Sequence, residues 1–129
     1  MVFSDTVEME DKMRLFCYIL NQTEYLDTIL TEFAHNGISG ATIIDSTGMA
    51  RVLSHKHGEE ELPFLASLRK FLNPDRESNN IILTVIRDEQ LTLAVDIIEK
   101  IVGSLEDQNK GIVFSFPLDF TKGIIENGK

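Results

Sequence analysis

The run Gly48-Met49-Ala50-Arg51 sets small residues beside a cation. Backbone N–H groups in such a turn can be exposed as an anion-binding nest, since little side-chain bulk keeps a ligand away. The guanidinium of Arg51 would add a forked donor that suits a carboxylate or a phosphate. A surface arginine that pairs with an acid explains the same residues. The run therefore predicts a small-anion site, with a plain ion pair as the alternative.

A second group, His55, His57 and the acids at 59–61, could supply imidazole and carboxylate ligands to a divalent metal. A defined metal site needs three or four ligands held in a fixed geometry. So polar a run is more typical of a solvated loop, and we favour that interpretation. A divalent-metal site stays open as the alternative.

No nucleophile stands beside a base in a pattern that would indicate an enzyme. The serines lack a Gly-x-Ser-x-Gly turn, and a Gly-x-x-x-x-Gly-Lys loop is absent. Cys17 lies inside an apolar run and is typical of a buried core residue. Asp88 and Glu89 stand at the expected start of a helix, where Asp88 would cap it. We therefore predict that the protein is not an enzyme.

The composition limits the partners. The chain has 129 residues, 43% hydrophobic content and a net charge of −9, which fits one domain and argues against nucleic acid. No run approaches the roughly 18 apolar residues of a membrane span, and the acidic start lacks the positive region of a secretory signal. We therefore predict a cytoplasmic protein that does not insert into membranes. Residues 51–76 hold five Lys and Arg against four acids, so this segment is +1 and the remainder is −10.

The elements that must position these residues follow from hydrophobic periodicity. Apolar residues at three- and four-residue spacing predict helices over 26–34 and 91–102, ended by Gly37 and Gly103. Short apolar runs predict four strands. The strands are expected at 14–20, 41–45, 81–86 and 112–117.

A long excursion, residues 49–79, separates the second strand from the third. Pro63 and an apolar stripe predict a short helix over 63–72. This helix either covers the second face of a sheet or docks onto a partner protein. The residues that would bind a partner are Phe64, Leu68 and Phe71, with Arg69 and Lys70 at the rim.

The order β-α-β, long loop, β-α-β predicts an α+β, ferredoxin-like βαββαβ fold, with two helices on one face of a four-stranded antiparallel sheet. A polar leader at 1–12 would precede a single domain at 13–129. The first and third strands are apolar on both faces, so the sheet has a second apolar face to cover. We expect another copy of the chain to cover it, with the loop helix as the alternative.

Three segments, in order and at compatible spacing, resemble the nitrogen-regulatory P-II superfamily. They are Gly37-Ile38-Ser39-Gly40-Ala41-Thr42-Ile43-Ile44-Asp45-Ser46-Thr47-Gly48-Met49-Ala50-Arg51, Leu83-Thr84-Val85-Ile86-Arg87-Asp88-Glu89-Gln90 and Lys110-Gly111-Ile112-Val113-Phe114-Ser115-Phe116-Pro117. The first is similar to the family's second strand and the start of its loop. The others are similar to the third strand with the following helix start and to the fourth strand.

The resemblance implies a homotrimeric signalling protein. Small effectors, commonly adenine nucleotides, would bind between subunits, and the long loop would control a transporter, an enzyme or a transcription factor. Thr42 would help to read the adenine, Gly48, Met49, Ala50 and Arg51 would line the cleft, and Lys110 would meet the phosphates. An adenine nucleotide is therefore the one cofactor that the resemblance suggests.

The sequence departs from the family on the phosphate side. Ile112 occupies the place of the phosphate lysine, and the residues after the fourth strand offer Lys122 where the family commonly has two arginines. We therefore expect an effector with one or two negative charges to bind better than a triphosphate. The alternatives are a trimer similar to the CutA divalent-metal-binding proteins and an interaction module without a ligand.

Overall fold

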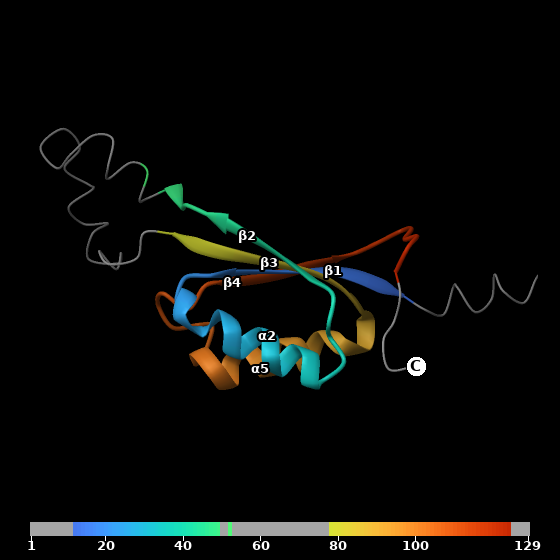
Figure 1. Cartoon of the computed structure of the whole chain (residues 1–129), viewed down its shortest axis with the longest axis horizontal. Coiled ribbons are helices and arrows are strands. Elements are labelled where there is room, and N and C mark those ends of the chain that lie inside the picture. Colours follow the sequence, from blue (N-terminus) through green and yellow to red (C-terminus); the bar gives the residue numbers. More distant parts are fainter. Residues whose placement is uncertain (1–11, 50–51, 53–77, 125–129) are drawn as a thin grey trace, which may run out of the picture.

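The structure is a computed structural model that describes residues 12–49, 52 and 78–124 (Figure 1). The predicted loop helix at 63–72 and the leader before Lys12 lie outside these residues. The strands are β1 (Met13–Leu20), β2 (Ala41–Ser46), β3 (Asn79–Arg87) and β4 (Ile112–Pro117). In the described part of the chain, the α-helices α2 (Leu26–His35) and α5 (Leu91–Val102) each follow a short 3-10 turn, at Thr23–Tyr25 and Asp88–Gln90.

The strands form one four-stranded sheet in the order β2-β3-β1-β4, and every neighbouring pair is antiparallel. Both α-helices lie on the same side of this sheet (Figure 1). The predicted α+β, ferredoxin-like fold is therefore confirmed. Strands β2 and β4 stand at opposite edges, with β3 and β1 between them.

The core lies between the sheet and the helices. Every second residue of β3 is buried, as expected for a strand with one face against a core. Phe16 of β1 meets Phe33 of α2 edge to face, with ring centroids 6.3 Å apart. Tyr18 and Ile82 are paired across β1 and β3, and both are fully buried.

The second face of the sheet is apolar as well, as the sequence predicts. The register sets Cys17 of β1 beside Leu83 of β3 and Phe114 of β4, so these side chains share that face. At the β4 edge, Ile112 is 61% exposed and Phe114 and Phe116 are each 46% exposed. Within the described residues, no helix covers this face (Figure 1).

The helix stops are as predicted, but one helix start is different. Gly37 and Gly103 take positive φ angles of 86° and 101°. Asp88 does not cap α5, because the chain already turns at Asp88: residues 88–90 form the 3-10 turn, and its N-cap is Arg87. The Asp88 N–H donates to the Lys12 carbonyl at 3.0 Å. The Gln90 side chain bonds back to the start of this turn: its Oε1 accepts a hydrogen bond from the Arg87 N–H at 2.8 Å. The Asp88 carboxylate faces Arg14, with 3.4 Å between Oδ1 and Nη1.

Candidate functional site

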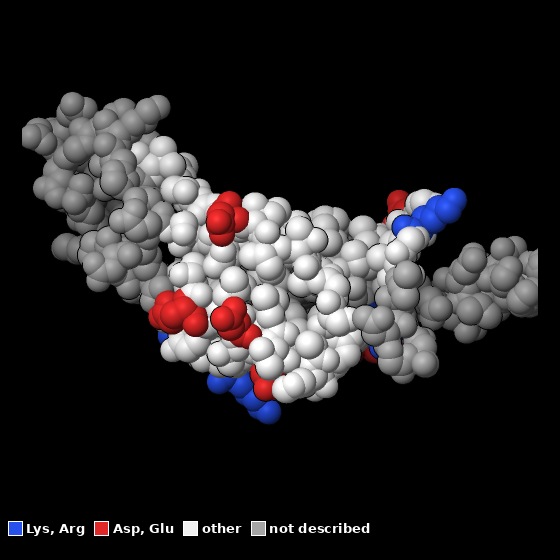
Figure 2. All heavy atoms as spheres, viewed as in Figure 1, with Lys and Arg blue, Asp and Glu red and all other residues white. Residues whose placement is uncertain are grey.

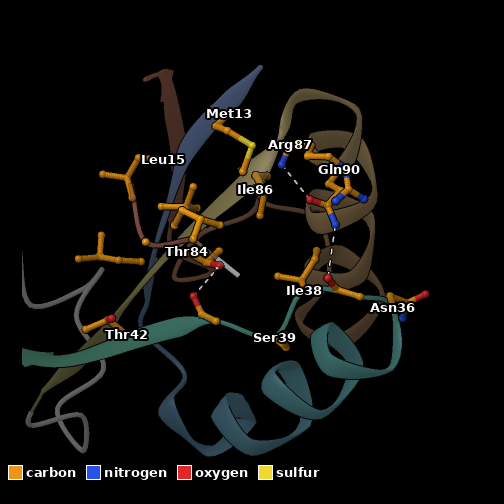
Figure 3. A pocket seen from close by; sticks show the side chains of 16 residues that line it. Met13, Leu15, Asn36, Ile38, Ser39, Thr42, Thr84, Ile86, Arg87 and Gln90 are labelled. Atoms are coloured by element: carbon orange, nitrogen blue, oxygen red, sulfur yellow. Dashed lines mark hydrogen bonds between the residues drawn. The ribbon is translucent and has the colours of Figure 1, made fainter. Parts of the chain in front are cut away.

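A cleft of about 660 Å³ opens where β2 parts from β3 (Figure 3). The β2–β3 pairing starts at Ala41 opposite Thr84, so residues 85–87 of β3 extend beyond the paired part of β2. The connector 36–40, which leaves α2, runs apart from this end of β3. The gap between the connector and β3 forms the cleft.

Hydrogen bonds from two buried side chains fix the distance between the cleft walls. Thr84, 2% exposed, donates from Oγ1 to the Gly40 carbonyl at 3.1 Å. Gln90, 8% exposed, donates from Nε2 to the Gly37 carbonyl at 3.5 Å. Figure 3 shows both side chains reaching from β3 and the start of α5 to the connector. The cleft is therefore built into the fold and does not depend on a ligand to form.

The lining combines apolar and polar residues in similar measure. Leu15, Leu83 and Val85 contribute the sheet side, and Ile38 contributes the connector side. Arg87 is the only charged residue among the described lining residues, and its Nε lies 2.8 Å from Oε2 of Glu89. Such a cleft suits a group that has both an apolar face and polar edges.

The structure separates the residues that the sequence assigns to one site. Thr42 lines the cleft. Gly48 and Met49 follow the far end of β2, where Met49 is 77% exposed. Ala50, Arg51 and the loop residues Phe64, Leu68, Arg69, Lys70 and Phe71 lie outside the described residues.

Lys110 stands at the opposite edge of the sheet from Thr42. It precedes β4, whereas Thr42 is on β2, and two strands lie between them. Its carbonyl accepts a hydrogen bond of 2.6 Å from the Tyr18 hydroxyl, and its side chain extends beside Gly103. Within one chain, therefore, Lys110 and Thr42 do not form a common site.

Several cleft residues were not assigned to a site from the sequence. Gln90 could have been identified from its spacing. It stands three residues after Arg87, and a glutamine at this distance from the start of a helix can bond back to the N-cap. Gly123 and Ile124 also line the cleft. They follow the last strand without any pattern, so the sequence offered no means to find them.

The remaining chemistry of the described residues is limited. No group of three or more His, Cys, Asp or Glu among them could hold a metal ion. Burial raises the pKa of the Cys17 thiol, which keeps the thiol protonated and weakly nucleophilic. In Figure 2, charged side chains stand in separate small groups, over the helix layer, over β2 and at the turn after β4. No described helix is long and apolar enough to cross a membrane.

No protein-family model and no curated protein matches the chain. Solved structures do match. PII of Arabidopsis thaliana bound to citrate has a TM-score of 0.55 and 15% identity, over 84% of this chain and 78% of that one. The GlnK–ATP complex of B. subtilis has a TM-score of 0.50 and 10% identity, over 83% and 82%. The chain has a PII-like fold.

A third match is a functionally unknown protein from Pediococcus pentosaceus, with a TM-score of 0.55 and 13% identity. It covers 88% of this chain and 99% of that one. The predicted resemblance to a divergent PII-like protein is therefore confirmed at the level of the fold. Identities of 10–15% do not carry binding residues from one PII-like chain to another.

Proposed function

We propose that this PII-like chain is a non-enzymatic regulatory protein of the cytoplasm that binds a small anionic effector between the subunits of a homotrimer. The effector would bias the loop at 49–79, and the loop would control a transporter, an enzyme or a transcription factor. The observation that carries the proposal is the placement of Thr42 and Lys110 at opposite edges of one sheet. Two subunits with neighbouring edges would bring one Thr42 close to the other's Lys110.

The exposed apolar face supports the association of subunits. Four large apolar side chains of β2 and β4 on this face are 42–61% exposed. Soluble monomers rarely leave so continuous an apolar surface open to water. A closed ring of three copies would bury this face and place each β2 edge near a β4 edge of the next copy. The four side chains are Ile44, Ile112, Phe114 and Phe116.

The cleft and its surroundings support an anion with a flat apolar part. The apolar residues of the lining would accept a ring, and the Thr42 hydroxyl would bond to its polar edge. The charged part would point along β2 toward Gly48 and Met49, which strand rise sets about 20 Å from Thr42, so the Ala50-Arg51 pair would have to fold back along β2 to meet it. Two similar structures hold anions, citrate in one and ATP in the other. An adenine nucleotide with one or two charges fits these conditions.

Regulation requires that the effector bind one conformation of the loop more tightly than another, because equal affinity shifts no equilibrium. The loop follows Gly48 directly and begins with Met49. A ligand beside these residues therefore contacts the base of the loop.

A thermal-shift screen tests for the effector. The probes are AMP, ADP, ATP, cyclic AMP, 2-oxoglutarate, bicarbonate, zinc and copper. A ligand at about 100 times its Kd adds roughly 2.7 kcal/mol to the free energy of unfolding. We expect a nucleotide to stabilise the protein.

Two other outcomes would favour the alternatives. Stabilisation by zinc or copper alone, lost in His55→Ala and His57→Ala, would favour the metal-binding alternative. The absence of a thermal shift with every probe would favour an interaction module without a ligand.

Mixed oligomers test whether the site is shared. Thr42→Val and Lys110→Ala should each weaken binding of the best probe, since each removes a hydrogen-bonding or charged partner worth about 1–3 kcal/mol. Co-expressed, the two defective chains should regain wild-type affinity at some sites, because one chain supplies Thr42 and its neighbour supplies Lys110. Calorimetry measures both affinities, and mixed oligomers without recovered sites would contradict a site shared between subunits.

A further inference from the structure

A groove of about 710 Å³ lies between α2 and α5, which are neighbours in the helix layer (Figure 1). Most of its lining residues are exposed, so the groove opens to solvent. Each helix lines it with a row of residues four positions apart, and residues at this spacing lie on one side of a helix. The α5 row is apolar, with Leu93, Ile97 and Ile101, whereas the α2 row, which ends at the C-cap, is polar, with Thr28, Glu32 and Asn36.

The apolar row is only partly covered. Ile97, in the middle of the row, is 7% exposed and forms the floor of the groove, whereas Leu93 is 36% exposed. The α2 row carries a hydroxyl, a carboxylate and an amide, so it offers little apolar surface to these side chains. Leu93 therefore keeps apolar area that a bound side chain would bury. An apolar row beside a groove is the arrangement that receives the apolar face of an amphipathic helix.

The charge of the groove decides the sign of its partner. Its charged lining residues are three acids and one lysine, which leaves a net charge of −2: Glu32, Asp96, Glu99 and Lys100. Glu99 is held in place, because its Oε2 accepts a hydrogen bond of 2.9 Å from the Leu105 N–H. Acids around an apolar floor attract a cationic partner and repel an acidic one.

A second copy of the chain is a poor occupant for this groove. Outside residues 51–76 the chain carries a charge of −10. Two copies that met groove to groove would also place the same acids against each other, because a two-fold contact uses the same surface on both partners. The charges therefore favour a different, basic protein.

We propose that the groove between α2 and α5 docks a cationic amphipathic helix of a partner protein. The apolar side chains of that helix would pack on Leu93 and Ile97, and its Lys or Arg side chains would meet Glu32 and Asp96. Each row spans eight residues, or about 12 Å, so a helix of two to three turns would fill the groove. The groove and the effector cleft share only Asn36 among the described residues, and the docking goes beyond the proposed function.

A synthetic peptide tests the groove. The probe is a helix-forming peptide of about 15 residues, with leucines on one face and lysines on the other, because shorter isolated helices are marginal in water. We expect calorimetry to show binding to the wild-type protein, and methyl NMR to show shifts at Leu93, Ile97 and Ile101. The same peptide with glutamates in place of the lysines should not bind.

Matched variants separate the groove from a general attraction to an acidic protein. Leu93→Ala should weaken binding of the lysine peptide by about three- to tenfold, through the lost apolar contact. Asp96→Asn should weaken it by about two- to fivefold, as expected for one exposed ion pair. Asp27→Asn removes the same charge from α2 outside the groove, and Phe120→Ala removes an exposed apolar side chain elsewhere. Both controls should bind the peptide as tightly as the wild type.

Several results would overturn the proposal. One is a wild-type protein that does not bind the lysine peptide, and another is an equal effect of Asp96→Asn and Asp27→Asn. Tighter peptide binding in Leu68→Ala would mean that the loop of the same chain competes for the groove. A lower mass of Leu93→Ala in light scattering would mean that a second copy fills it. Either of these last two results would replace the partner protein as the occupant.

Discussion

Tyr18 shows how a single side chain couples the sheet to the loop before β4. Its ring is fully buried, and its hydroxyl donates to the Lys110 carbonyl at 2.6 Å. Burial raises the pKa of Tyr18 to about 12, because the phenolate loses its water. The ionised form would also lose the proton that bonds to Lys110.

Tyr18 predicts a loss of stability at high pH. The unfolded chain releases the phenol proton near pH 10 and the folded chain near pH 12, so the unfolded state binds fewer protons between these values. The free energy of unfolding should therefore fall as pH rises through this window, by up to about 1.4 kcal/mol per pH unit from this group. Urea titrations at several pH values measure the slope.

Tyr18→Phe is the control for this slope. The variant should be less stable at pH 7 by about 1 kcal/mol, since the Lys110 carbonyl loses its partner. It should also lose the part of the alkaline slope that Tyr18 contributes. Equal slopes in the wild type and the variant would show that Tyr18 is not the group responsible.

At the scale of the elements, the turn into β4 tolerates no side chain. Gly111 has a φ of 99°, and a Cβ there would collide with the Ile19 carbonyl and the Tyr18 ring. Gly111→Ala should therefore cost more than about 3 kcal/mol of unfolding free energy, from both the backbone strain and the clash.

Gly123→Ala separates the strain from the clash. Gly123 has a similar φ of 93° with open space around it, so this variant should lose only about 1–2 kcal/mol. Denaturant unfolding of the two variants gives the difference. Equal losses would mean that close packing against β1 does not hold the start of β4 in place.

At the scale of the whole molecule, the uncovered sheet face predicts an oligomer. Light scattering at micromolar concentration should give about three times the 14.6 kDa mass of one chain. Phe114→Asp should dissociate it, because the carboxylate would be buried between subunits. Leu93→Asp is the matched control, since Leu93 is 36% exposed on α5 and not on this face, and it should leave the mass unchanged. A monomeric wild type would contradict both the covered face and the shared site.

Much of the fold can be predicted from the residues. Short apolar runs located the four described strands, and helical spacing with glycines at 37 and 103 located α2 and α5, although β3 is longer than predicted, at Asn79–Arg87. These patterns work because the spacing of apolar residues reports which faces of a strand or helix avoid water, and that depends on local geometry. The same patterns also revealed the second apolar face. Asp88 was assigned wrongly because the chain turns one residue earlier than the apolar spacing indicates: Asp88 begins a 3-10 turn, and Arg87 is its N-cap.

The cleft could not be predicted in this way. Its lining comes from the connector after α2, the end of β3 and residues 123–124 after β4, which are far apart in sequence. Their meeting depends on the strand order, which no local spacing encodes. The sequence placed Thr42 and Lys110 in one site through resemblance, and the strand order placed them at opposite edges. Local periodicity thus sets the elements and their buried faces, whereas long-range pairing sets which surfaces adjoin.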